Sequence, residues 1–278
     1  MYLTFYGLRE NPFSVTSDPS FLFPSSTHTE ALDHLSYGIE QRKGFLAITG
    51  EIGSGKTTLC RALLNRLDAK TKVALILNSI LPEKQLLEAI VEEFGVAVEK
   101  STRGALIRRI NEFLLKQLAT GNNAVLIIDE AQNMRSSALE TVRMLSNLET
   151  EKEKLLQIVL IGQPQLRDKL NSPDLLQLRQ RIAVRFHIRA LTRQEVAAYI
   201  LHRLTVAGSP GGIVFEEAAV EAIYAYTGGI PRLINLLADR ALLKGFVEET
   251  FTISLDHIRK CIDEVEGEYV PPCPRTPP

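Results

Sequence analysis

The chain has 278 residues, a formal net charge of −1, 45% hydrophobic residues and 23% charged residues. These values are typical of a soluble globular protein with one large and one smaller domain. They exclude an overall positive charge of the kind that attracts nucleic acid or anionic membranes. No apolar run is long enough to span a bilayer, and the first residues lack the apolar core of a signal peptide. The three cysteines are widely spaced and show no ligand pattern with the histidines, so we expect reduced thiols, no zinc site and a cytoplasmic location.

Residues 1–30 are rich in turns and aromatic side chains, which predicts an N-terminal arm. In one interpretation the arm simply packs on the protein, and in the other it lies near the adenine end of a nucleotide site; the two are compatible. Residues 29–41 then carry apolar side chains on one helical face. Residues 45–49 form a short apolar run that is typical of a buried strand.

The segment after this strand fits the phosphate-loop pattern of a glycine, four variable residues and then Gly-Lys-Ser/Thr. A helical pattern over 57–67 follows, so the motif lies at the strand-to-helix turn that it requires. Glycines let the backbone direct N–H groups at phosphate oxygens, and the helix N-terminus adds its positive dipole end. We expect Lys56 to contact the outer phosphates and Thr57 to bind Mg²⁺; the alternative is a tight glycine-rich turn. The predicted nucleotide-binding residues here are Gly50, Glu51, Ile52, Gly53, Ser54, Gly55, Lys56, Thr57 and Thr58.

Strand and helix patterns alternate up to residue 190, which predicts an α/β core with a five-stranded parallel sheet. After the phosphate loop, the strands are predicted at 73–78, 124–130, 155–162 and 184–188, and the helices at 82–94, 102–120, 136–149 and 175–182.

The predicted strand 124–130 is an unbroken apolar run that ends in two carboxylates, Asp129 and Glu130. Such a run suits a parallel strand covered on both faces. Strand alternation would point the two side chains in different directions. We expect Asp129 to reach Mg²⁺ and Glu130 to act on the attacking water; the alternative is that the two acids only cap the next helix.

Gln163 follows the predicted strand 155–162 and precedes a proline. A polar residue there faces the crevice where open parallel sheets bind ligands, so Gln163 is a candidate for contact with the γ-phosphate or the water. The alternative is a turn residue before a proline-started helix. Several arginines between residues 179 and 193 are surface residues in one interpretation, and in the other one of them stabilises a phosphate bound by a neighbouring subunit.

Beyond residue 190 the patterns predict helices only. Thr192 and Glu195 form a capping box that opens a helix to about residue 206. Further helices are predicted at 216–226, from Pro231 to about 247, and from a Ser254 cap to about 266, with a hinge at Gly228-Gly229. The proline-rich end is a linker composition that does not pack. The predicted domains are an arm at 1–30, a core at 31–190, a helical lid at 191–266 and a linker or tail at 267–278.

This order of motifs resembles the AAA+ ATPases, P-loop proteins in which a helical lid follows an αβα core. The resemblance covers about residues 30–266 and implies Mg²⁺-dependent hydrolysis of ATP to ADP and phosphate by an oligomer. It implies that Gln163 is the first sensor, where that family usually has asparagine, and that Arg232 is the second sensor on the lid. It also implies that Arg181 is the arginine finger, with Arg179 as the competing candidate.

A narrower resemblance links the chain to the general secretion pathway A family of bacterial cytoplasmic ATPase domains. The segments that carry it are Phe-Tyr-Gly-Leu-Arg-Glu-Asn-Pro-Phe at residues 5–13, Asp-Glu-Ala-Gln at 129–132 and Ile-Gly-Gln-Pro at 161–164. Many members continue into a membrane span and a periplasmic domain, which would tether this chain to the inner membrane if more chain follows.

The resemblance implies an ATPase that drives or regulates assembly of a secretion or envelope apparatus, with a protein of that apparatus as its partner. One alternative is a DNA-binding AAA+ regulator of transposition, whose members share the Asp-Glu-Ala-Gln style of motif. That class needs a basic surface, which a net charge of −1 does not favour. Another alternative is a nucleotide-gated scaffold with negligible turnover, which an intact Lys56 and Glu130 argue against.

Overall fold

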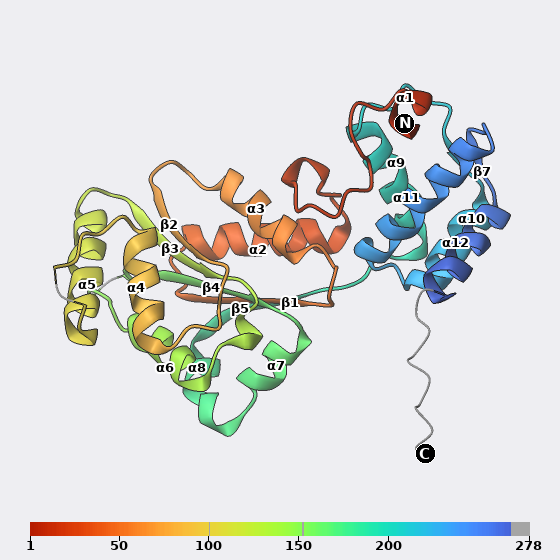
Figure 1. Cartoon of the computed structure of the whole chain (residues 1–278). Coiled ribbons are helices and arrows are strands. Elements are labelled where there is room, and N and C mark those ends of the chain that lie inside the picture. The colour runs from red at the N-terminus through yellow and green to blue at the C-terminus, as the bar shows by residue number, and fades with distance from the viewer. Residues whose placement is uncertain (100, 152, 268–278) are drawn as a thin grey trace, which may run out of the picture. The chain divides into compact units, whose positions relative to one another are not determined.

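The computed structural model describes residues 1–99, 101–151 and 153–267, which form two compact units (Figure 1). The sheet unit comprises residues 26–52 and 56–189. The helical unit comprises residues 1–25, 53–55 and those from 190 onward. Apart from Gly267, the predicted proline-rich tail lies outside the described residues. Within the described residues, no helix combines the length and the apolar character that a membrane crossing requires.

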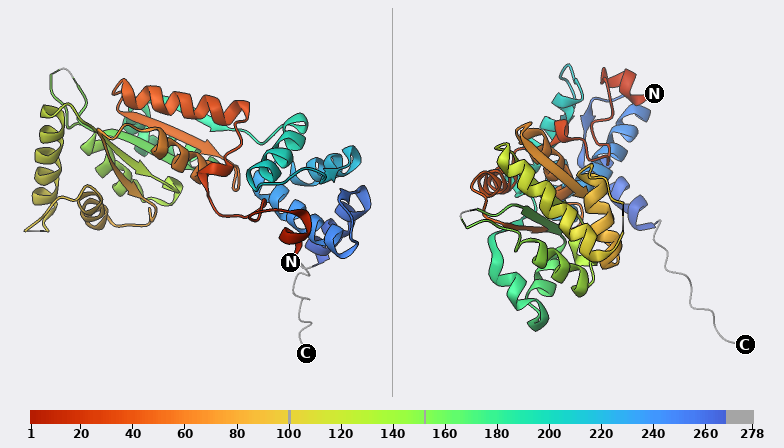
Figure 2. Two further views of the ribbon diagram at one scale, coloured as in Figure 1. Left: turned by 90° about the horizontal axis from the view of Figure 1, so that it is seen from above. Right: turned by 90° about the vertical axis from the view of Figure 1, so that its left-hand side faces the viewer.

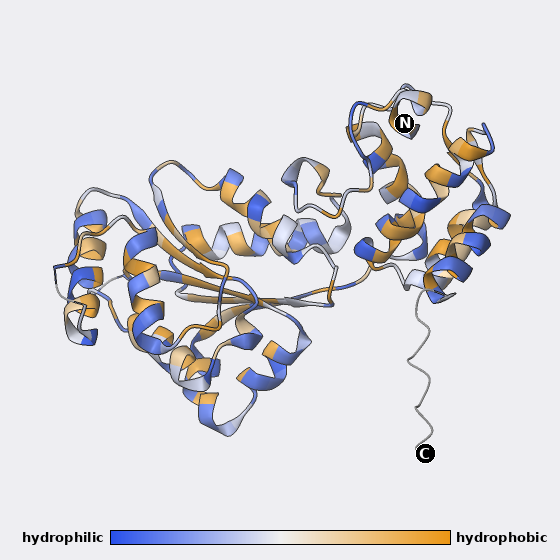
Figure 3. Cartoon of the chain, in the orientation of Figure 1, coloured by the Kyte–Doolittle hydropathy of each residue, from blue (hydrophilic) through white to orange (hydrophobic). Residues whose placement is uncertain are grey.

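The sheet unit contains five parallel strands in the order β2-β3-β4-β1-β5, which confirms the predicted parallel sheet. Its central strands are almost wholly apolar and buried, as Figure 3 shows by their hydrophobic colouring. The strands are β1 (Phe45–Gly50), β2 (Thr71–Ile76), β3 (Asn123–Ile128), β4 (Gln157–Gly162) and β5 (Ile182–Ile188).

Helices cover both faces of this sheet, as Figures 1 and 2 show. Helices α2 (Ser26–Glu40) and α3 (Lys56–Arg66) lie on one face. Gly38 of α2 allows a close approach there, because a Cβ at this position would lie 2.1 Å from Cδ2 of Leu46. Alternate strand residues form a core with the helices of the other face. Those helices are α4 (Glu83–Glu93), α5 (Arg103–Ala119), α6 (Ser136–Leu145), α7 (Pro164–Leu170) and α8 (Leu176–Arg181).

Several predicted boundaries in this unit are wrong; strand β2, for example, spans Thr71–Ile76 rather than residues 73–78, and strand β5 begins at Ile182 rather than at residue 184. Strand β3 ends at Ile128 rather than residue 130, because Asp129 and Glu130 already belong to the following turn. Helix α6 ends at Leu145 rather than residue 149, because the chain turns there into an antiparallel bridge between Glu149 and Lys154. Strand β4 begins at Gln157, since the preceding leucines lie in the approach to the strand.

The helical unit is built on α9 (Arg193–Val206), α10 (Glu217–Thr227), α11 (Pro231–Val247) and α12 (Leu255–Gly267). The capping box predicted for α9 is confirmed: the Thr192 side chain accepts from the Glu195 N–H, and the Glu195 carboxylate accepts from the Thr192 N–H. The unit also holds two short parallel strands, β6 (Val214–Phe215) and β7 (Thr252–Ile253), which the prediction of helices only misses.

The predicted hinge at Gly228-Gly229 lies inside the helical unit, between α10 and α11. Both glycines have positive φ, 57° and 78°, and a Cβ on Gly229 would lie 1.9 Å from the Leu191 carbonyl oxygen. This turn is therefore a close-packed element within one unit. The main chain passes between the units near residues 25–26, 52–53, 55–56 and 189–190, and the hinge at Gly228-Gly229 stays a prediction.

The N-terminal residues pack against the helices of the same unit through α1 (Tyr2–Tyr6) and the short 3-10 helix η1 (Pro19–Phe21). The hydroxyl of Tyr2 donates to Asp239 at 2.6 Å, and the hydroxyl of Tyr6 donates to the Thr250 carbonyl at 3.0 Å. The buried guanidinium of Arg203 donates to the Pro12 and Ser14 carbonyls. The proposed nearness of this arm to adenine stays a prediction.

Candidate nucleotide site

Three loops with polar side chains leave the carboxyl edge of the sheet side by side. Strand β4 lies between β3 and β1 in the sheet. Gln163 follows β4, Asp129 follows β3, and the phosphate loop follows β1. Ligands of open parallel sheets bind outside the carboxyl ends of the strands. The order of the strands therefore brings together motifs that lie more than a hundred residues apart in sequence.

The phosphate loop connects β1 to α3, which begins at Lys56. Gly53 and Gly55 have φ values of 80° and 93°, a backbone conformation that glycine adopts without strain. Lys56 is 5% exposed as a residue, and its ammonium donates to the carbonyl oxygens of Gly50, at 2.9 Å, and Glu51, at 2.8 Å. Burial lowers the pKa of Lys56, although the negative charges of nearby carboxylates act to raise it. The loop thus holds a desolvated cation above the first turn of a helix.

Thr57 and Asp129 face each other across the site. The Thr57 hydroxyl donates to Oδ2 of Asp129 at 3.0 Å, and Oδ1 of Asp129 accepts the backbone N–H of Glu130 at 2.8 Å. Burial raises the pKa of Asp129, and the Glu130 charge raises it further, while these hydrogen bonds and Lys56 oppose the change. A hydroxyl and a carboxylate oxygen are hard ligands that suit Mg²⁺, which usually keeps several waters besides a few protein oxygens. The donor set therefore fits the predicted metal.

Glu130 lies outside strand β3, so strand alternation does not set the direction of its side chain, and that part of the prediction is corrected. Its backbone adopts φ 52° and ψ 36° and precedes the 3-10 helix η2 (Ala131–Asn133). Left-handed backbone is uncommon in residues other than glycine and often marks a functional position. The Ser79 hydroxyl donates to the Glu130 carbonyl at 2.7 Å and ties the loop after β2 to this turn. The turn, rather than the strand, sets the direction of the Glu130 carboxylate.

Two amide side chains hold the Glu130 carboxylate. Nε2 of Gln163 donates to Oε2 of Glu130 at 3.0 Å, and Nε2 of Gln132 donates to the same oxygen. Gln163 is also the residue before the proline that starts α7. Its backbone therefore forms the turn before this helix, while its side chain contacts Glu130. Sequence reasoning gave no role to Gln132 or Ser79. Two signals in the sequence point to Gln132: it lies two residues after Glu130, and it ends the Asp-Glu-Ala-Gln segment that carries the family resemblance.

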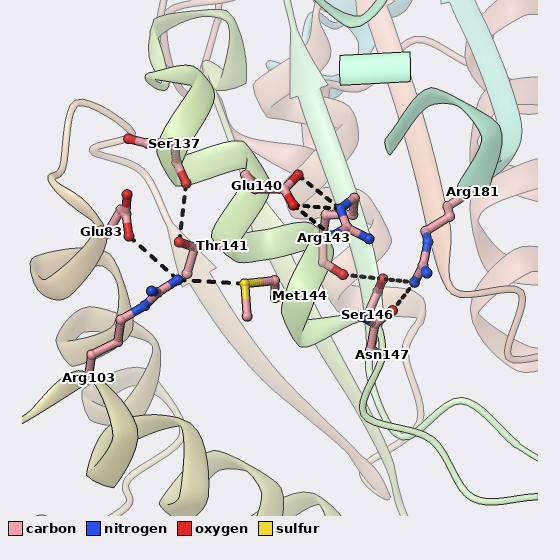
Figure 4. Close-up of polar contacts among 10 residues, drawn as sticks. All are labelled: Glu83, Arg103, Ser137, Glu140, Thr141, Arg143, Met144, Ser146, Asn147 and Arg181. Atoms are coloured by element: carbon pink, nitrogen blue, oxygen red, sulfur yellow. Dashed lines mark hydrogen bonds and ion pairs between the residues drawn. The ribbon is translucent and has the colours of Figure 1, made fainter. Parts of the chain in front are cut away.

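Arg181 lies at the opposite end of the sheet from the phosphate loop. It precedes Ile182, which pairs with Phe45 at the start of β1, whereas the phosphate loop follows Gly50 at its end. As Figure 4 shows, the Arg181 guanidinium donates to Oγ of Ser146 at 3.1 Å and to Oδ1 of Asn147, both just after α6.

Arg179 is exposed, and its guanidinium has no hydrogen bond or ion pair with any residue that the structure describes. Neither Arg181 nor Arg179 is therefore brought to the nucleotide loop of its own sheet. Arg232 is the second residue of α11 in the helical unit. The roles of these three arginines stay predictions.

Comparison with known proteins gives a family and a fold. Residues 39–170 match the model of the AAA domain family. Over 268 residues, 96% of its length, the chain is 45% identical to General secretion pathway protein A from Aeromonas hydrophila, and it spans 49% of that protein. The chain thus corresponds to about half the length of this relative.

Two solved structures of other proteins show the same fold. The Aeropyrum pernix ORC2 protein, solved as ADPNP-ADP complexes, matches with a TM-score of 0.67 and 18% identity, over 92% of this chain and 71% of that one. The Thermotoga maritima RuvB Holliday junction branch migration motor matches with a TM-score of 0.57 and 20% identity, over 85% of this chain and 68% of that one. At such low identity, these matches show the fold alone: a P-loop αβα core followed by helices.

Proposed function

We propose that this chain, an AAA+ P-loop protein homologous to General secretion pathway protein A, binds ATP with Mg²⁺ and hydrolyses it to ADP and phosphate. The observation that supports this most is the convergence of a buried lysine, a hydroxyl–carboxylate pair and an oriented second carboxylate at one sheet edge. A protein that only bound nucleotide would not need Glu130 held at this point.

Each group has a distinct task in this proposal. The N–H groups of the phosphate loop and Lys56 hold the phosphates, and Thr57 and Asp129 hold the metal. Mg²⁺, when bound, neutralises charge on the phosphate oxygens. Glu130 accepts a proton from water as the water oxygen bonds to the γ-phosphorus, the bond from that phosphorus to the bridging oxygen breaks, and ADP leaves. Gln163, which contacts the same carboxylate, is placed to orient the water or the γ-phosphate.

The test of hydrolysis is phosphate release by the purified chain at several protein concentrations, with Mg²⁺ or with an excess of EDTA. We expect turnover that needs the metal and that disappears in Glu130→Gln. Equal release from the parent and from Glu130→Gln would contradict the proposed chemistry.

We further propose that the protein acts as a homo-oligomer in which an arginine of one subunit completes the site of its neighbour. The support is the position of Arg179 and Arg181 at the sheet end away from their own phosphate loop. Arg181 is the finger in the family resemblance, although its guanidinium is bound to Ser146 and Asn147 in the isolated chain. Arg181 must leave these partners to act in a neighbour, whereas Arg179 need not.

Mixing two inactive variants tests this assembly. An Arg181→Ala subunit keeps an intact nucleotide loop, and a Lys56→Ala subunit keeps an intact arginine, so assemblies of both should regain activity if Arg181 acts between subunits. The matched mixture with Arg179→Ala assigns the role to one arginine. If neither mixture regains ATPase activity, and the assemblies are shown to contain both kinds of subunit, an action between subunits is contradicted.

In the cell, we propose that this ATPase drives or regulates assembly of a secretion or envelope apparatus from the cytoplasmic side. The support is the 45% identity to a protein named for the general secretion pathway, of which the chain spans about half. A DNA-binding regulator is the second candidate, because the fold is shared with proteins such as the Drosophila ORC solved bound to DNA. The net charge of −1 favours the first.

A further inference from the structure

Gln132 makes two different hydrogen bonds with one amide group. Its Oε1 accepts the backbone N–H of Gln163 at 3.0 Å, and its Nε2 donates to Oε2 of Glu130. A backbone N–H can only donate, so the amide oxygen must face Gln163 and the amide nitrogen must face the carboxylate. The orientation of this amide is therefore fixed by chemistry.

The surroundings of Gln132 keep it in this place. Lys169 of α7 donates to the backbone carbonyls of Gln132 and Met134, each at 2.6 Å, and so ties the η2 turn to α7. Gly162 at the end of β4 leaves room for the amide, because a Cβ there would lie 2.7 Å from Oε1 of Gln132. Both the backbone and the side chain of Gln132 are thus positioned by β4 and α7.

The result is an asymmetric Glu130 carboxylate. Oε2 receives both amide donors, whereas Oε1 has no hydrogen bond with any residue that the structure describes. Two donors on one oxygen fix the rotation of the carboxylate and leave the other oxygen as the proton acceptor. Small errors in the position of a reacting group can lower a rate by about a hundredfold, so such fixing matters for catalysis.

From these contacts we propose that Gln132 is a positioning residue: it fixes the Glu130 carboxylate, and links it to Gln163, so that Oε1 of Glu130 accepts the proton of the attacking water. This rests on the proposed ATPase function. In this proposal Gln132 acts through its hydrogen bond to Glu130 rather than on the nucleotide or the water. Its loss should lower kcat while KM for ATP and nucleotide affinity stay unchanged, because the phosphate loop is not altered.

Two substitutions separate the two hydrogen bonds. Gln132→Glu keeps an oxygen that accepts from Gln163 but places a second carboxylate against Glu130. Gln132→Met has a similar length and loses both bonds. We expect kcat to fall about tenfold or more in each, and at least as far in Gln132→Glu, with KM for ATP within about twofold of the parent.

Gln165→Glu is the matched control, because Gln165 is an exposed glutamine on α7 whose side chain bonds to no described residue. It makes the same charge change nearby and should leave kcat unchanged. Adding Gln132→Met to Glu130→Gln should not lower the residual rate further, since the carboxylate it positions is already absent. A parent-like kcat in Gln132→Glu, or a KM that rises in step with the loss, would overturn the proposal.

Crystal structures of the parent and of Gln132→Met test positioning without any measurement of turnover. We expect one Glu130 rotamer in the parent and a different or a mixed rotamer in the variant. An unchanged Glu130 rotamer would overturn the proposal even if the parent hydrolyses ATP. If the parent shows no turnover, the proposed ATPase function is contradicted. The two crystal structures then still test whether Gln132 positions Glu130.

Discussion

In the sheet unit, polar side chains gather at one edge and bond mainly to one another, whereas in the helical unit they tie the first residues of the chain to the helices. Lys56, Asp129 and Glu130 are held close together where carboxylate repulsion and burial both cost free energy. Arg203, also buried, donates to the carbonyls of Pro12 and Ser14 in the N-terminal segment and lies over the ring of Phe21, whereas the carbonyls that accept from Lys56 belong to the phosphate loop itself. Buried polarity thus serves chemistry in one unit and chain anchoring in the other.

Removal of the catalytic groups of the sheet unit should affect chemistry and leave the fold intact. Glu130→Gln should keep ATP binding and lower turnover by about a hundredfold or more, because an amide cannot act as a base. Lys56→Ala should lose ATP binding, because a charge on the outer phosphates is gone. Nucleotide titration and phosphate release measure both effects.

The same two variants should unfold close to the parent temperature, because Lys56 donates only to carbonyls of its own loop and a glutamine in place of Glu130 keeps an oxygen that can accept from Gln132 and Gln163. Circular dichroism during heating provides this check. A melting point lowered by many degrees in Glu130→Gln would mean that its contacts with Gln132 and Gln163 hold the fold, contrary to the contrast drawn above.

In the helical unit the expected effect is on stability. Arg203→Leu removes the donors to Pro12 and Ser14 and the cation over Phe21, and should lower the free energy of unfolding by about 2 kcal/mol or more. Denaturant unfolding measures the loss, and limited proteolysis shows whether residues 1–25 become the first site of cutting. Arg240, a half-buried arginine on α11 of the same unit, supplies the comparison variant Arg240→Leu. Equal losses in both would show that the contacts of Arg203 are not special.

One buried thiol in each unit can report on that unit alone. Burial raises the pKa of Cys60 in α3 to about 12 and that of Cys261 in α12 to about 11, so neither holds much thiolate at pH 8. In a Cys273→Ser background, we expect slow labelling of both by a thiol reagent, and faster labelling as the pH rises.

Adding Arg203→Leu should then speed the labelling of Cys261 several-fold and leave that of Cys60 almost unchanged. Mass spectrometry of digested protein distinguishes the two sites. A parallel increase at Cys60 would show that the units open together rather than separately.

The smallest expected effect concerns DNA. Positive charges are scattered among nearly equal negative ones, 32 against 33, so phosphate contacts should be too few for tight duplex binding at physiological salt. We expect no rise in ATP turnover across a DNA titration at two salt concentrations. A severalfold stimulation that weakens with salt would replace the secretion proposal by the DNA-binding regulator.

Much of the fold could be predicted because its signals are local. The apolar runs of β1, β3 and β4, the glycines of the phosphate loop and the Thr192–Glu195 capping box each lie within a few residues of one another. Local periodicity also separates the alternating α/β region from the helices that follow. The boundaries that failed, at Ile128 and Leu145, are turns whose position depends on contacts with other elements.

The candidate site divides in the same way. The phosphate loop, the adjacent carboxylates and the polar residue after β4 could be predicted from the sequence, because each follows a recognisable strand. Only the tertiary structure decided that Gln132 and Gln163 share one oxygen of Glu130, that Ser146 and Asn147 bind Arg181, and that Arg203 holds residues near Pro12. Such contacts join residues from two to 191 positions apart, and they arise from strand order and helix packing, which no local pattern encodes.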